Sequence, residues 1–147
     1  MLTAHADQTV LGYLGRALSL ELSAVQLYST QARLTESWGL AEVAAKFSAE
    51  ASEELGHAER IISRMLALGV APNASQLRPV RLGSNLQQLL QHDYVFEKEL
   101  VGLYEAAPRH CARTGDHDGR VFFEALLGEE QAHAKGLEQW LQQLQQV

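Results

Sequence analysis

The chain has 147 residues, of which 46% are hydrophobic and 20% charged, the balance of a globular domain with a substantial core. Its net charge of −6 argues against a general nucleic-acid-binding protein, and its single cysteine excludes an intramolecular disulfide and a CxxC motif. No apolar run approaches the roughly 20 residues of a membrane span, and the start of the chain lacks the features of a signal peptide. We therefore expect a cytoplasmic protein with a single domain over residues 1–147.

The first predicted element is a long helix. Asp7 is a suitable N-cap, and apolar residues recur at helical spacing from about residue 8 to the break at residues 37–39. Glu21 interrupts this apolar stripe. A charge on an apolar face is costly unless something pairs with it, so Glu21 is a candidate functional residue.

A second helix is predicted from about Leu40 to Leu68, where Gly69 is a stop signal. Glu54 interrupts its apolar stripe, and His57 follows three residues later. Side chains three residues apart leave the same face of a helix. Glu54 and His57 can therefore hold one metal ion together.

Residues 69–83 contain proline and glycine and lack a helical pattern. This connection of about 15 residues is longer than the links between neighbouring helices in bundles. It predicts a long crossover between the second and third helices.

The third helix is predicted from Ser84, as its cap, to about Ala112, with an irregular end near Pro108. Glu97 lies on its apolar stripe, and Asp93 lies one turn earlier on the same face.

The fourth helix is predicted to begin at Asp116 or Asp118 and to continue to the C-terminus. Glu130 and His133 lie on its apolar stripe. They repeat the glutamate–histidine spacing of the second helix.

The two halves of the chain share one pattern of ligand candidates. Glu21 precedes Glu54 by 33 residues (54 − 21), and Glu97 precedes Glu130 by the same 33 (130 − 97). Each histidine follows its glutamate by three residues. One glutamate on one helix and Glu-x-x-His on the next is the pattern of ferritin-like di-iron and di-manganese proteins. The sequence therefore predicts an all-α, ferritin-like four-helix bundle that binds two metal ions.

The charge and the donor atoms of these residues also suit a site for two metal ions. Two divalent ions carry a charge of +4, which four carboxylates neutralise, so that the filled site can be buried. Carboxylate oxygen and imidazole nitrogen suit iron or manganese. The metal-binding and catalytic candidates are the six repeated residues: Glu21, Glu54, His57, Glu97, Glu130 and His133.

With these residues in place the chain resembles the bacterioferritins over nearly its whole length. The resemblance is carried by four segments in gap-free register, residues 21–24, 38–40, 54–58 and 129–133.

The resemblance implies ligand roles for the six candidates. It makes Glu21 and His57 terminal ligands of one iron, Glu97 and His133 terminal ligands of the other, and Glu54 and Glu130 bridges. Tyr28 matches a family tyrosine near the site that can donate an electron.

The expected function is that of a ferroxidase for iron storage or detoxification. It would oxidise Fe(II) with O2 or H2O2 at a di-iron centre, with manganese as the alternative metal. The expected assembly is a homo-oligomer, between a dimer and the family's cage of 24 subunits, without nucleic acid or membrane.

Three departures from the family pattern qualify this expectation. The haem-ligating methionine is replaced by Leu55, so haem is not expected. The histidine of an inner-surface iron site is replaced by Ala49, although Glu53 keeps the acid. The chain ends at Val147 without the short fifth helix of the family, so a closed cage is not implied.

Two alternatives stay open at this point. One is a small di-iron or di-manganese oxidase or peroxidase that stores nothing. The other is a partner subunit that assembles with a haem-bearing bacterioferritin chain.

Overall fold

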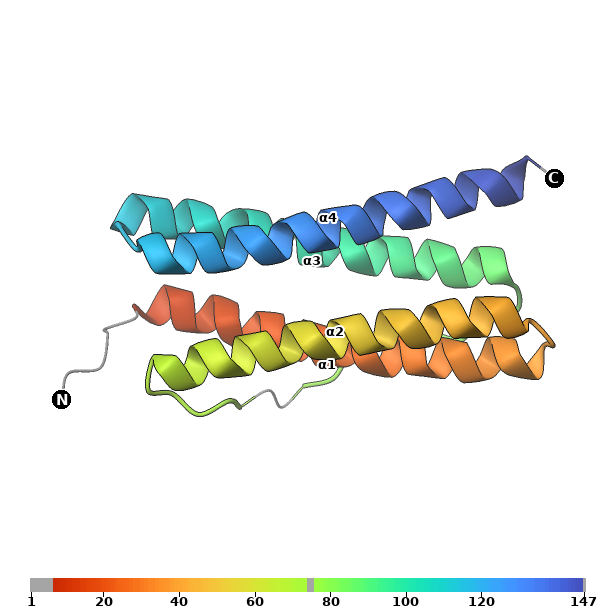
Figure 1. The fold of residues 1–147 in the computed structure, drawn as a ribbon, viewed down its shortest axis with the longest axis horizontal. Helices are drawn as coiled ribbons and strands as arrows, with labels where there is room; N and C mark the ends of the chain where they lie inside the picture. The colour runs from red at the N-terminus through yellow and green to blue at the C-terminus, as the bar shows by residue number, and fades with distance from the viewer. Residues whose placement is uncertain (1–6, 74–75, 147) are drawn as a thin grey trace. The chain divides into compact units, whose positions relative to one another are not determined.

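The computed structural model describes residues 7–73 and 76–146, and within these ranges it contains four α-helices and no β-strand. They are α1 (Gln8–Ser37), α2 (Ala41–Ala67), α3 (Leu86–Thr114) and α4 (His117–Gln145) (Figure 1). The helices belong to two compact units that divide after Val80. In the first unit α1 packs on α2, and in the second α3 packs on α4. None of the described helices is long and apolar enough to cross a membrane.

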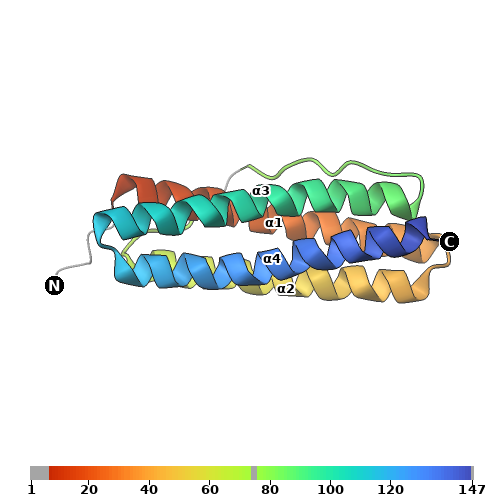
Figure 2. The same cartoon turned by 90° about the horizontal axis from the view of Figure 1, so that it is seen from above.

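The first unit is an antiparallel helical hairpin, as both views show (Figures 1 and 2). The side chain of Asp7 caps α1 by accepting a hydrogen bond of 2.7 Å from the Val10 N–H, which confirms the predicted start. The chain reverses at Gly39, whose φ of 81° is a conformation that glycine adopts without strain. Because the loop is this short, α2 returns along α1 and the glutamates of both helices are brought together.

The connection after α2 contains no helix in its described part, which agrees with the predicted crossover. It is attached to the side of α1: the Arg78 backbone N–H donates a hydrogen bond of 2.9 Å to Ser23 Oγ. Ser23 is itself buried, and its hydroxyl donates to the Ser19 carbonyl at 2.7 Å. This anchor lies only two residues from Glu21 along α1.

The start and the end of α3 differ slightly from the sequence prediction. Asn85, and not Ser84, is the N-cap, because Asn85 Oδ1 accepts a hydrogen bond of 2.9 Å from the Gln88 N–H. Ser84 instead donates its hydroxyl to Gln88 Oε1. The helix continues through Pro108 and ends at Thr114, two residues later than predicted.

The corner between α3 and α4 is tightly packed. Gly115 makes the turn with a φ of 78°, and Asp116 caps α4 by accepting a 2.9 Å hydrogen bond from the Gly119 N–H. The buried thiol of Cys111 lies 3.9 Å from the second carboxylate oxygen of Asp116. A Cβ added at Gly119 would overlap Asp116 Oδ2 and approach Cys111 Sγ to 3.0 Å.

Gly119→Ala is therefore expected to lower the free energy of unfolding, by about 1–2 kcal/mol, because the cap must move or break. Gly128→Ala is the matched control on the same helix, since nothing lies within 4 Å of an added Cβ there. It should raise the stability by up to about 1 kcal/mol through its better helix propensity. Urea denaturation followed by circular dichroism measures both changes, and equal shifts in the two variants would contradict this account of the corner.

Candidate metal centre

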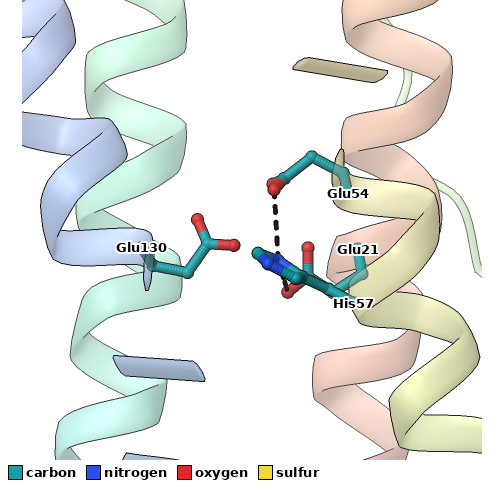
Figure 3. A group of neighbouring side chains, drawn as sticks. All are labelled: Glu21, Glu54, His57 and Glu130. Atoms are coloured by element: carbon teal, nitrogen blue, oxygen red, sulfur yellow. Dashed lines mark ion pairs between the residues drawn. The ribbon is translucent and has the colours of Figure 1, made fainter. Parts of the chain in front are cut away.

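The first half-site consists of Glu21 on α1 with Glu54 and His57 on α2. Both glutamates are fully buried, and the His57 side chain is only 5% exposed. His57 Nδ1 lies 3.2 Å from Glu54 Oε1 and 3.3 Å from Glu21 Oε2. Figure 3 shows the three side chains converging, with the two glutamates on either side of the imidazole. The helical spacing of Glu54 and His57 and the antiparallel return of α2 together produce this convergence.

The second half-site has the same composition, with Glu97 on α3 and with Glu130 and His133 on α4. Glu97 and Glu130 are fully buried, and the His133 side chain is 12% exposed. His133 Nδ1 lies 3.6 Å from Glu130 Oε2. The second hairpin therefore repeats the arrangement of the first with slightly looser contacts.

In each half-site one ligand atom from every residue lies within 4.8 Å of the others, which is close enough to hold one metal ion. Two carboxylates and one imidazole are donors that suit iron or manganese. Two buried carboxylates about 4 Å apart repel each other by about 4 kcal/mol at an effective dielectric constant near 20. A divalent cation reverses this repulsion, so the donor set fits a metal ion.

All six residues predicted from the sequence occupy their expected places on the helices. The structure brings Glu21, Glu54 and His57 together in one unit, and it brings the other three together in the second. Leu55, between the two α2 ligands, is 45% exposed. Ala49 and Glu53 are also exposed. These three residues therefore lie outside the buried first half-site.

The repeat between the two halves extends beyond the six ligand candidates, to aromatic residues that were not predicted as part of it. Tyr28 packs on Phe47 in the first unit, with ring centroids 6.3 Å apart, and Tyr104 packs on Phe123 in the second, at 6.4 Å. Each residue of the second pair lies 76 positions after its counterpart, as Glu97 does after Glu21 (97 − 21). This shared offset of 76 residues was the feature of the sequence from which the aromatic repeat could have been predicted.

Comparison with known proteins agrees with the fold. A family model described as a ferritin-like domain matches residues 11–147. The chain is 39% identical to the bacterioferritin of Rhodobacter capsulatus over 132 residues, covering 90% of this chain and 82% of the relative. It is 33% identical to the bacterioferritin of Brucella melitensis over 141 residues, covering 96% of this chain and 88% of the relative.

A solved structure of Rhodobacter capsulatus bacterioferritin is also similar, with a TM-score of 0.92 and 37% sequence identity. The match covers 96% of this chain and 88% of that chain. That structure has a metal-free dinuclear site and haem iron in a crystallographic special position.

The helices and the carboxylate–histidine half-sites define a ferritin-like protein, and the chain belongs to the ferritin family. Within that family its similarity is to the bacterioferritins. The predicted all-α, ferritin-like four-helix fold is thereby confirmed. At the level of the family, the function is iron storage and ferroxidase chemistry.

Proposed function

We propose that this chain is a ferroxidase of the bacterioferritin type, which binds Fe(II) as its substrate and passes electrons to O2 or H2O2. The observation that carries the proposal is the buried cluster of Glu21, Glu54 and His57, whose donor atoms lie within 4.8 Å of one another. The same three residue types recur at the same spacing in the second unit. Burying two such clusters of carboxylates is costly unless a cation balances their charge, which supports a metal ion at each of them.

In this proposal the two half-sites form one dinuclear centre within a single domain. As the resemblance to the bacterioferritins implies, Glu21 and His57 would bind one iron ion, and Glu97 and His133 would bind the other. Glu54 and Glu130 would be shared by both ions. The equal composition of the half-sites supports this assignment, as does the similarity to a bacterioferritin with a dinuclear site.

The protein's contribution is to position the ions and to balance their charge. Four carboxylates neutralise two Fe(II) ions, and the imidazoles complete each coordination shell without adding charge. The metal supplies the redox chemistry when it is bound. The surrounding apolar core excludes bulk water from the carboxylates.

We also propose that the protein works as a homo-oligomer and without haem. Haem is unfavourable because Leu55 offers no thioether ligand. The relative from Rhodobacter capsulatus contains haem iron, so this chain would differ from it at that site.

A di-iron or di-manganese oxidase without iron storage is the second candidate. The exposed alanine at position 49, in place of the histidine of an inner-surface iron site, favours it. Native mass spectrometry separates the two, because storage requires a closed shell and a monomer or dimer would exclude it.

The test of the proposed function is an anaerobic titration of the apo-protein with Fe(II), followed by exposure to O2. The proposal requires two tightly bound ions per chain and rapid oxidation on mixing. One ion per chain, or oxidation no faster than in buffer, would refute the dinuclear ferroxidase. Parallel titrations with Mn(II) determine which metal the site prefers.

A further inference from the structure

Asp93 is a fully buried carboxylate of α3 that the proposed ligand set does not use. It precedes Glu97 by four residues, so the two side chains leave the same face of the helix, with their Cβ atoms about 5–6 Å apart. Glu97 and Glu130 are also fully buried. The second unit therefore buries three carboxylates, of which one lies a single turn from a proposed ligand but outside the ligand set.

The first unit has no counterpart of Asp93. The offset of 76 residues that relates the ligands of the two units places Ala17 at this position (93 − 76), and Ala17 is fully buried on α1. Among the described residues of the first unit, Glu21 and Glu54 are the only carboxylates that are fully buried. The surroundings of the two half-sites therefore differ by one negative charge, although their ligand types are the same.

This difference corresponds to the charges of two different ions. A divalent ion neutralises the two carboxylates of the first half-site, whereas a trivalent ion neutralises the three that the second unit buries. None of the lysine and arginine side chains in the described part of the second unit is buried, so a bound ion supplies the positive charge at that depth. Hydrogen bonds to Asp93 favour its charged form and leave this count unchanged.

We propose that Asp93 makes the second half-site the one that favours a trivalent ion, an inference that rests on the proposed function. Asp93 does not bind the ion; its charge acts on the site formed by Glu97, Glu130 and His133. When Fe(II) passes one electron to O2 or H2O2, the ion gains one positive charge. Fe(III) formed at the second half-site is therefore held more tightly than Fe(III) formed at the first. Even across about 10 Å, at an effective dielectric constant near 20, one carboxylate changes the preference for that extra charge by about tenfold.

Redox-inactive ions test this preference without the oxidation reaction. Crystals of the full-length wild-type protein are soaked anaerobically with less than one equivalent of Tb(III) or Mn(II), and anomalous scattering measures the occupancy of each half-site. The ratio of second-site to first-site occupancy should be about tenfold higher for Tb(III) than for Mn(II). Equal ratios for the two ions, or Tb(III) mainly in the first half-site, would overturn the role of Asp93. Failure of both ions to bind at either half-site would instead contradict the proposed function.

Asp93→Asn removes the charge and keeps the shape of the side chain. Its occupancy ratio for Tb(III) should fall about tenfold, towards the ratio for Mn(II), and it should still bind two Mn(II) per chain. In protein loaded with two iron ions, one of the two one-electron reduction potentials should rise by about 59 mV for each tenfold loss of preference for Fe(III). Asp93→Glu keeps the charge and should keep the preference. A purely structural role would not produce this dependence on the charge of the ion.

Asp118→Asn is the matched control, because it makes the same substitution at an exposed position at the start of α4 in the same unit. It should leave the Tb(III) ratio and both reduction potentials unchanged, since only a buried charge near the site is expected to act. A folded Asp93→Asn protein with the wild-type ratio and potentials would overturn the proposal. If Asp93→Asn does not fold, the soaks of the wild-type crystals decide the question.

Discussion

Replacing Glu54 by alanine is expected to abolish the rapid oxidation of Fe(II) by O2. Glu54 is fully buried and lies 3.2 Å from His57, and in the proposed centre it binds both ions. Loss of a group that merely orients a ligand already costs metal sites about 10- to 100-fold. Loss of a bridging ligand should therefore cost at least about 100-fold in the initial rate, as measured by stopped-flow absorbance.

The repeated half-site makes this prediction more demanding, because Glu130→Ala should cause a loss of similar size. Glu59→Ala is the matched control: it removes an exposed carboxylate from α2 and should leave the rate unchanged. If Glu54→Ala were inactive while Glu130→Ala kept the wild-type rate, the assignment of two bridging glutamates would be wrong. The activity would then belong to the first half-site alone.

Metal binding is expected to raise the melting temperature strongly. A ligand that binds only the folded state stabilises it by about 4 kcal/mol at a thousandfold excess over its dissociation constant. In a chain of this size that corresponds to a rise of roughly 10 °C. The apo-protein also carries the repulsion between the carboxylates of Glu21 and Glu54. Calorimetry of apo-protein and of protein loaded anaerobically with Fe(II) measures the difference.

The variant Glu54→Gln distinguishes the effect of metal binding on the melting temperature from the stability of the metal-free fold. Glutamine keeps the volume of the side chain and removes its charge, so the apo-variant should melt above the apo wild type. Added Fe(II) should then raise its melting temperature much less. An equal metal-induced rise in both proteins would show that the ion binds elsewhere.

The helices could be predicted closely from the sequence because their signals are local. The cap at Asp7, the break before Gly39 and the cap at Asp116 each depend on residues a few positions apart. The start of α3 was misplaced by one residue because Ser84 and Asn85 are both good caps. Only the backbone geometry selects Asn85, whose side chain reaches the Gln88 N–H.

The candidate ligands were also recognisable in the sequence, because a carboxylate in an apolar stripe is rare and the same spacing occurs twice. Their convergence in each unit then follows from helical periodicity and a short antiparallel turn.

The sequence by itself determined four helices, the long connection and the six residues that repeat between the halves. These features are local or periodic. Only the tertiary structure decided which groups from different segments meet: the anchor of the Arg78 backbone N–H on Ser23, and the pairing of Tyr104 with Phe123. Such contacts join segments separated along the chain, and their geometry follows from how two helices pack, which no local pattern encodes.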